Sequence, residues 1–262
     1  MGEVVVITSG KGGVGKTTTT ASLGVALSNL GKTVAVIDLD IGLRNLDVAL
    51  GLDEKIVYDL VDVLEKKCRL RQALIHHESH NVWLLAASQT REKEDVSPEK
   101  MKMLCQEMRE RYDYVLIDCP AGIDRGFENA IAGADRALVV TVPQMAAVRD
   151  ADMVLEKLSQ GGIEKRELII NRMRADLADK NGILSVGDIL EWLGTDLIGV
   201  VPEDETVFLC GIQGKVATDA KGSMAGIAYG NIARRLLGEK VDIMDMQSKR
   251  KGFFRFFRRR KR

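Results

Sequence analysis

Short apolar runs alternate with helical stretches along most of the chain. The runs are rich in Val, Ile and Leu, which is typical of buried strands, and they read VVVITS, TVAVIDLD, NVWLLAA, DYVLIDCP, RALVVTVP, ELIINR and DLIGVVPED. Nearly continuous apolar runs indicate parallel strands that are covered on both faces. Helical stretches lie between them, for example residues 16–31, which end at Gly31, and residues 185–194, which begin at Ser185 and end at Gly194. The pattern predicts an α/β fold with a mostly parallel, doubly wound sheet flanked by helices.

Residues 249–262, KRKGFFRFFRRRKR, break this pattern. They hold nine of the 38 Lys and Arg residues, four of the six Phe residues and no acid. Residues 1–248 therefore carry 29 basic and 38 acidic side chains, a net charge of −9, although the whole chain is neutral. We expect one domain over residues 1–240, followed over residues 241–262 by a linker and an amphipathic helix.

Drawn as a helix with 100° per residue, this C-terminal tail has one aromatic face. Phe253, Phe254, Phe256 and Phe257 share that face, while most basic side chains, including Arg258, lie on the other. The pattern is typical of a helix that lies in a membrane interface and binds anionic lipid. A solvated basic tail and a DNA-binding tail are the alternatives. Contact with nucleic-acid phosphates requires the basic residues but not four phenylalanines, so we expect a membrane partner and no nucleic acid.

The composition adds constraints on location and on metals. The chain has no run of about 18 uncharged apolar residues, and no signal region precedes the first apolar run. Its four cysteines show no CxxC spacing, which favours free thiols in a reducing cytoplasm over disulfides or zinc. We expect His76, His77 and His80 in a polar loop rather than at a metal, and Trp83 and Trp192 in the core.

A glycine-rich loop follows the first apolar run, in the sequence TSGKGGVGKTT over residues 8–18. Its Gly10, Gly12 and Gly15 satisfy G-x-G-x-x-G, the pattern of dinucleotide-binding loops. That pattern also requires an acid at the end of the next strand, and Asp38 lies about there. A hydride-transferring enzyme is therefore one interpretation of the loop.

The segment from Gly10 to Thr17 also satisfies G-x-x-x-x-G-K-[ST], the phosphate-binding P-loop. In such a loop, backbone N–H groups and the start of the following helix surround an anion, Lys16 reaches the β- and γ-phosphates, and the Thr17 hydroxyl binds Mg²⁺. A P-loop protein also needs an apolar strand that ends in Asp, and YVLID ends in Asp118, which would act through the metal's shell. Because the dinucleotide pattern leaves Lys16 and Thr17 unexplained, we favour a P-loop that binds a nucleoside triphosphate and Mg²⁺ over a dinucleotide site or a glycine-rich turn without a ligand. The predicted nucleotide-binding residues of the loop are Gly12, Gly13, Val14, Gly15, Lys16, Thr17 and Thr18.

Other polar residues follow the neighbouring strands. Asp38 and Asp40 end one strand beside the loop. In the simplest arrangement, one of these carboxylates contacts the water molecules bound to Mg²⁺ and the other contacts the attacking water. Asn171 ends the strand ELIIN, and its amide offers the adenine edge a donor and an acceptor. Lys11 is a second lysine early in the loop, where it would point out of its own pocket. It is either a solvated lysine or a group that reaches a phosphate bound by another subunit.

Several motifs resemble those of one protein family. KGGVGKTT resembles the deviant Walker A motif of the ParA/MinD ATPases, DLDIGLRNLD resembles their switch I, DCPAGID their switch II, and VPED their adenine-side loop. The resemblance covers essentially the whole chain, and the basic, aromatic tail is typical of members that place the cell-division site. It implies a P-loop NTPase fold and an ATP-bound homodimer in which Lys11 reaches across the interface and is catalytic together with Lys16 and Asp40.

The resemblance also implies roles for the other site residues. Asp40 would orient the attacking water, and Asp152 resembles a position near the dimer face, although an exposed helix acid is an equal alternative. The implied metal residues are Thr17, Asp38 and Asp118. The implied residues around the base are Asn171, Pro202 and Glu203, the last two through their backbone.

The function implied by the resemblance is Mg²⁺-dependent hydrolysis of ATP to ADP and phosphate, coupled to a membrane switch. The ATP-bound dimer would attach to the inner membrane through its tail, recruit a MinC-like protein to place the division site and respond to a MinE-like protein. Its location would be the cytoplasm and the inner surface of the cell membrane. A DNA-partitioning ATPase of the same family is the alternative, but it would need basic patches on a body whose net charge is −9.

Overall fold

The computed structural model describes residues 1–174, 177 and 183–244. The predicted tail helix, including Phe253, Phe254, Phe256, Phe257 and Arg258, lies outside the described residues, so the domain boundary near residue 240 stays a prediction. In the described part of the chain, no helix combines the length and the apolar character that crossing a bilayer requires.

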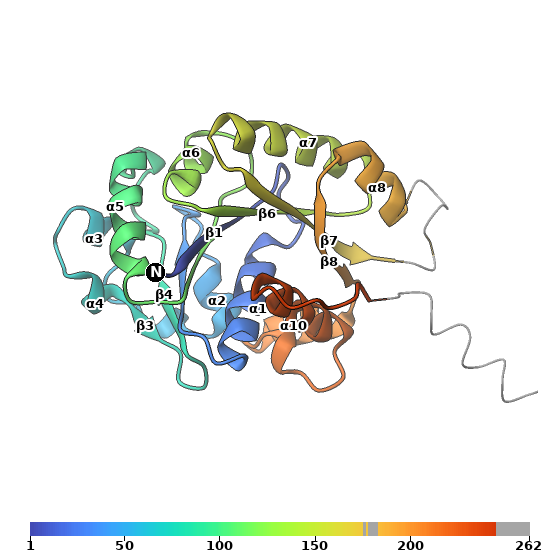
Figure 1. Cartoon of the computed structure of the whole chain (residues 1–262). Helices are drawn as coiled ribbons and strands as arrows, with labels where there is room; N and C mark the ends of the chain where they lie inside the picture. The colour runs from blue at the N-terminus through green and yellow to red at the C-terminus, as the bar shows by residue number, and fades with distance from the viewer. Residues whose placement is uncertain (175–176, 178–182, 245–262) are drawn as a thin grey trace, which may run out of the picture.

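One sheet runs through the centre of the molecule, with its strands in the order β3-β4-β2-β5-β1-β6-β7-β8 (Figure 1). All neighbouring strands are parallel except β3 and β4, which confirms the predicted architecture. The sequence did not predict β3, because a strand of two residues has no measurable periodicity. The strands are β1 (Glu3–Thr8), β2 (Val34–Asp38), β3 (Ile75–His76), β4 (Val82–Leu85), β5 (Tyr114–Asp118), β6 (Arg136–Thr141), β7 (Lys165–Met173) and β8 (Asp196–Pro202).

Helices cover both faces of the sheet and, where their ends were predicted, begin and end as expected. The side chain of Ser185 caps α8 in a capping box, and Gly194 ends that helix in the left-handed region with φ 56°. Gly31 follows α1 with φ 81°. The helices are α1 (Lys16–Asn29), α2 (Leu46–Leu50), α3 (Leu60–Leu64), α4 (Leu70–Ala73), α5 (Pro98–Arg109), α6 (Arg125–Ile131), α7 (Met145–Gln160), α8 (Val186–Leu193), α9 (Glu205–Ile212) and α10 (Met224–Leu236).

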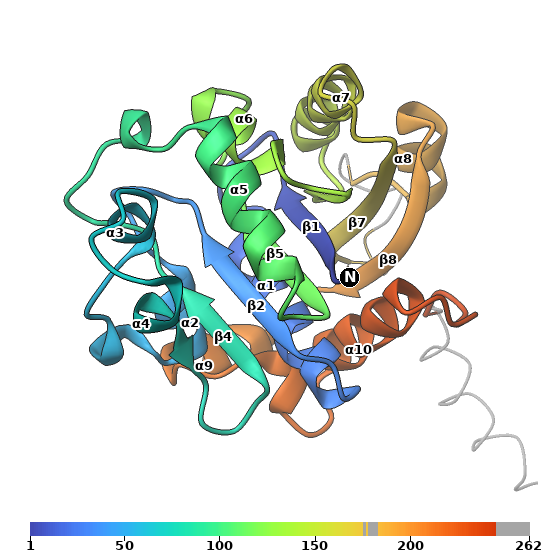
Figure 2. The same cartoon turned by 60° about the vertical axis from the view of Figure 1, so that its left-hand side comes forward.

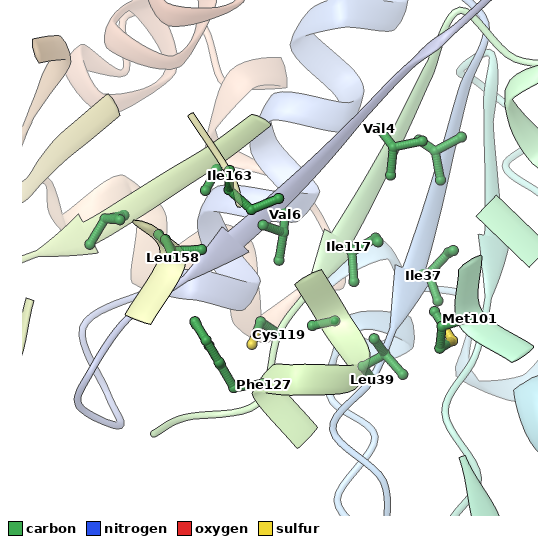
Figure 3. Packing of buried hydrophobic residues seen from close by; sticks show 14 of the residues in the cluster. Val4, Val6, Ile37, Leu39, Met101, Ile117, Cys119, Phe127, Leu158 and Ile163 are labelled. Carbon is green, nitrogen blue, oxygen red and sulfur yellow. The ribbon is translucent and has the colours of Figure 1, made fainter. Parts of the chain in front are cut away.

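The sheet separates two hydrophobic cores because successive side chains of a strand point to opposite faces. On β1, Val4 and Val6 pack with α5, α6 and α7, as Figure 3 shows from close by. Val5 and Ile7 pack on the other face with α1, α2 and α10. Figure 2 shows α5 lying across one face of the strands while α1 and α10 lie behind them. Burial of both faces explains the nearly continuous apolar runs of the strands.

The prediction that both tryptophans lie in the core was wrong. The prediction that the histidines lie in a polar loop is confirmed for His77 and His80, between β3 and β4, but not for His76. Trp192 lies on α8 with half of its surface exposed, and Trp83 on β4 is only half-buried. His76 belongs to β3 rather than to a loop, and its ring lies 4.5 Å from that of Trp83 between centroids. A nitrogen of the His80 ring lies 2.8 Å from a carboxylate oxygen of Asp219. These contacts give the two histidines structural partners.

Candidate nucleotide-binding site

The glycine-rich loop connects β1 to α1 and passes close to two other elements. Gly13 and Gly15 adopt left-handed backbone conformations with φ 77° and 97°, which side-chain-bearing residues rarely adopt. A Cβ atom on Gly15 would lie 2.3 Å from the amide nitrogen of Asn171. A Cβ atom on Gly10 would lie 2.4 Å from the carbonyl oxygen of Asp150 on α7. The glycines therefore allow the loop to fit tightly between β7 and α7.

The start of α1 is left open for an anion. The residue at its N-cap, Gly15, supplies no side-chain hydrogen bond, and the first turn contains no acid, so the positive end of the helix is not compensated locally. Lys16 begins the helix and is only 9% exposed. Within the described residues, no carboxylate lies at ion-pairing distance from its ammonium group. A largely buried ammonium group beside unpaired helix N–H groups is a suitable partner for phosphate.

Two buried carboxylates lie beside this positive region. Asp38 and Asp118 are register partners at the ends of β2 and β5, and both are essentially inaccessible to solvent. Burial, together with the nearby Asp38 carboxylate, raises the pKa of Asp118 to about 7. The hydrogen bonds from the hydroxyls of Thr17 and Thr20 and the positive charge of Lys16 act in the opposite direction. Burial also raises the pKa of Asp38, although three backbone N–H groups donate to it. The positive and hydrogen-bonding groups near the two carboxylates therefore do not fully offset the cost of burying their charge.

This donor set fits Mg²⁺. The ion prefers oxygen ligands and keeps several of its waters, and the hydroxyl of Thr17 lies within hydrogen-bonding reach of the buried Asp118 carboxylate. A divalent cation here would also relieve the repulsion between Asp38 and Asp118. The structure thus brings together the three residues predicted for the metal.

Asp38 has a second function that the sequence did not predict. Its carboxylate accepts hydrogen bonds from the backbone N–H groups of Asp40, Asn45 and Leu46 at 2.8, 3.1 and 3.0 Å. These bonds tie the segment after β2, which carries Asp40, to the strand end and to the start of α2. The position of Asp40 therefore depends on the carboxylate of Asp38.

A cavity of about 820 Å³ continues from the loop toward β7, β8 and α9. Its size lies in the range of small-molecule sites. Three residues predicted around the base, Asn171, Pro202 and Glu203, line it. The other lining residues are Gly15, Thr18, Arg172, Asp204, Glu205, Val207, Phe208, Leu209, Gly211, Ile212 and Tyr229.

The amide of Asn171 holds the loop from the side of this cavity. Its nitrogen donates to the Val14 carbonyl oxygen at 2.8 Å, and its oxygen accepts from the Arg172 backbone N–H at 2.9 Å. A carboxamide has two N–H bonds and an oxygen with two lone pairs. One donor and one acceptor site therefore remain, so the adenine contact stays a prediction beside an observed role in supporting the loop.

Sequence reasoning missed two further residues of the cavity. Arg172 has φ 52°, an uncommon conformation for a residue with a side chain, at an irregularity in the β7–β8 pairing. Asp204 caps α9 and accepts hydrogen bonds from Thr206, Ser223 and Ala225. Partial burial alone would raise the pKa of Asp204, but these hydrogen bonds lower it to about 2. An acid just before the start of a helix is the signal that would have identified this cap.

Lys11 lies away from the buried phosphate-side residues. Its side chain is exposed, and its carbonyl oxygen accepts a hydrogen bond from the Ser9 hydroxyl at 2.8 Å. Together with Arg172, Arg174 and Gln144 it lines a smaller cavity of about 350 Å³ on the outer side of the loop. Asp152 is also exposed, on α7. The loop therefore presents one lysine inward and the other toward solvent.

Residues 2–169 match a family model described as an AAA domain. The septum site-determining protein MinD of Bacillus subtilis (strain 168) is 48% identical over 256 residues, covering 96% of this chain and 95% of that protein. The chain belongs to the MinD family. MinD proteins are septum site-determining members of the ParA/MinD ATPases, and this membership rejects the dinucleotide interpretation of the loop.

Solved structures of the MinD family have the same fold. A chain of the MinC:MinD cell division protein complex of Aquifex aeolicus superposes with a TM-score of 0.87 at 40% identity, covering 93% of this chain and 99% of that chain. MinD of Pyrococcus horikoshii complexed with Mg-ADP superposes with a TM-score of 0.82 at 28% identity, covering 92% of this chain and 100% of that chain. The predicted P-loop NTPase fold is therefore confirmed.

Replacement of Asp204 by Ala tests the anchor of the cavity's outer wall. The loss of the cap should lower the free energy of unfolding by about 1–2 kcal/mol and weaken ATP binding, because α9 borders the cavity. The folded pKa lies below the ordinary value of 3.8. The difference in the free energy of unfolding between the parent and the variant should therefore be largest above about pH 4 and decrease as the pH falls toward 2. Urea unfolding at several pH values measures this difference. Glu191→Ala, on the exposed face of α8, is the control. Equal losses of unfolding free energy in the two variants would contradict the anchoring role of Asp204.

Proposed function

We propose that this chain is a Mg²⁺-dependent ATPase that dimerises when ATP-bound, attaches to the inner membrane through its C-terminal tail and places the division site with MinC-like and MinE-like partners. The observation that supports its nucleotide chemistry best is Lys16, a largely buried ammonium group with no ion-pair partner among the described residues, at the open start of α1. Family membership supports the role in septum placement.

The residues around the loop would divide the chemistry between them. Backbone N–H groups of the loop and Lys16 would hold the phosphates, and Thr17, Asp38 and Asp118 would hold Mg²⁺, which when bound would neutralise phosphate charge. Asp40 would orient the attacking water, at a position maintained by the hydrogen bonds of Asp38.

The base would lie in the larger cavity. Asn171 would offer its remaining donor and acceptor to the adenine edge, and the backbone of Pro202 and Glu203 would flank the ring. The Pyrococcus relative complexed with Mg-ADP supports this choice of ligand.

Lys11 would complete the site of a second subunit. It is exposed on the outer side of the loop, so it is free to approach another molecule that packs against this surface. Dimerisation would then join two half-sites, and a monomer would hydrolyse ATP slowly. The same event would bring two tails together on one particle.

The tail would convert dimerisation into membrane attachment. Each basic residue near an anionic surface contributes roughly 1 kcal/mol, and partial burial of each Phe adds about 1–2 kcal/mol. Ordering a short helix opposes these gains, so one tail would bind weakly. Two tails on a dimer would bind with avidity, because the second contact is intramolecular.

The partners follow from relatives. The Aquifex structure contains MinC with MinD, which supports a MinC-like partner for this chain, and a MinE-like stimulator of hydrolysis is proposed from the family alone. The DNA-partitioning alternative is less favoured, because residues 1–248 have a net charge of −9.

Replacement of Lys11 by Ala tests the shared active site. The variant should bind ATP as the parent does, because Lys16 and the loop N–H groups remain, but it should stay monomeric with a non-hydrolysable ATP analogue and lose at least tenfold in turnover. Size-exclusion chromatography with light scattering measures the dimer, and phosphate release measures turnover. Lys32→Ala, at a partly exposed lysine after α1, is the control. A normal analogue-dependent dimer of the Lys11 variant would reduce this residue to a solvated lysine.

The double substitution Phe253→Glu with Phe256→Glu tests the membrane anchor. Acidic groups on the aromatic face should remove ATP-dependent binding to anionic vesicles, because they are costly to bury and are repelled by the lipid. ATP binding and basal turnover should not change. Co-sedimentation with phosphatidylglycerol vesicles in ATP and in ADP provides the measurement, with Val57→Glu, at a side chain that is 80% exposed, as control. Undiminished binding of the double variant would assign attachment to another part of the chain.

A further inference from the structure

Helices α3, α4 and α5 lie next to the β3–β4 edge of the sheet (Figures 1 and 2). Residues of these helices and of the segment between α3 and α4 line a groove of about 620 Å³. It shares no lining residue with either cavity at the nucleotide loop. Its lining residues are Val63, Leu64, Lys66, Cys68, Arg69, Leu70, Arg71, Lys100, Met103, Leu104, Glu107 and Arg111. The mechanism of ATP hydrolysis uses none of them.

The rim of the groove is strongly basic. The side chains of Lys66, Arg69, Arg71 and Lys100 are exposed, and none of them has an ion-pair partner within the part of the chain that the structure describes. The acid of the lining, Glu107, is already paired with Arg111 at 3.0 Å. The described lining side chains thus carry four uncompensated positive charges on a body whose net charge is −9.

The backbone at Lys66 adds to this observation. Its φ is 61°, in the left-handed region, where a glycine would avoid a strain of roughly 1 kcal/mol or more. A lysine at this turn places a positive charge at the rim despite that strain.

The floor of the groove is apolar and adaptable. Leu70 and Leu104 are buried beneath it, while Val63 and Leu64 are half-buried. Met103 stands 71% exposed at its edge, and an unbranched methionine adjusts easily to a partner's shape. The groove therefore offers apolar contacts in its centre and positive charges around them.

We propose that this groove binds an acidic amphipathic segment of another protein, helical when bound. Apolar side chains at helical spacing would enter the floor, and carboxylates beside them would pair with Lys66, Arg69, Arg71 and Lys100, which is the helix-in-groove mode of recognition. The charges would steer the partner and set its register, and the apolar anchors would give affinity. The chain's own tail is excluded because it is basic, and a flat bilayer surface does not fill a concave floor.

Selection from a displayed library of helical peptides tests the proposal. The bait is the full-length protein, and the counter-selection uses Arg69→Glu with Arg71→Glu, two exposed positions where substitution leaves the core intact. Recovered peptides should combine Asp or Glu with apolar residues spaced three and four positions apart. They should bind the double variant at least tenfold more weakly than the parent and should lose affinity as salt rises.

Three controls locate the binding. Lys157→Glu with Lys221→Glu makes the same charge change at exposed positions outside the groove and should leave affinity unchanged. A photo-crosslinking residue at Met103 should label the recovered peptides. The basal ATPase rate of the Arg69 and Arg71 variant should equal that of the parent, which separates this proposal from the nucleotide site.

The other outcomes contradict the proposal. Enrichment of no acidic peptide, or equal binding to both double variants, would exclude the groove as a site for such a segment. Displacement of the peptide by phosphatidylglycerol vesicles, tested in the Phe253→Glu with Phe256→Glu background, would assign the groove to lipid instead. Self-association of the parent that Arg69→Glu with Arg71→Glu abolishes would assign it to a second copy of this chain.

Discussion

The structure concentrates buried charge at the point where β1, β2 and β5 end and α1 begins. Parallel strands bring Asp38 and Asp118 side by side in register, and the glycine-rich loop places Lys16 at the start of the helix beside them. Solvent reaches none of the three to any large extent. Buried charge is tolerated only where it is compensated. On the proposed function, the protein supplies part of this compensation, and bound Mg²⁺ and phosphate would supply the rest.

The other features of the site follow from that arrangement. Asp38 also binds the backbone of the segment that carries Asp40, so the metal-side carboxylate and the residue proposed to direct water are linked through three hydrogen bonds. Asn171 ties β7 to the loop at Val14, so a direct hydrogen bond joins the base side of the cavity to the phosphate side. The same loop carries the exposed Lys11.

Local patterns predicted much of this, because they depend on neighbours in sequence. The strands were visible in apolar runs, the loop in its glycines, and the ends of α8 in Ser185 and Gly194. The two-residue strand β3 was missed, and Trp192 was placed in the core because size and hydrophobicity do not show which face of a helix is covered.

Contacts between distant residues were not predictable from those patterns. The support of the loop by Asn171 spans 157 positions, and the bond between Asp204 and Ser223 forms only when β8 and α10 pack together. The basic groove is similar, since residues 63–71 and 100–111 have no visible relation until α3, α4 and α5 meet. Local sequence was therefore sufficient to identify the site. The contacts that support the site, and the basic groove, could be recognised only from the fold.

Replacement of Lys16 by Met most directly tests whether the buried charge at α1 exists to bind nucleotide. Methionine has nearly the same length and lacks the charge, so the substitution also removes the attraction between Lys16 and the Asp118 carboxylate. Thermal and urea unfolding should be followed with and without Mg-ADP. The parent should gain about 2.7 kcal/mol at a nucleotide concentration of 100 times its Kd. The variant should gain nothing when nucleotide is added, whatever its stability without nucleotide. A variant that is destabilised without nucleotide, yet is stabilised by Mg-ADP as much as the parent, would show that Lys16 is a structural residue and would contradict the account.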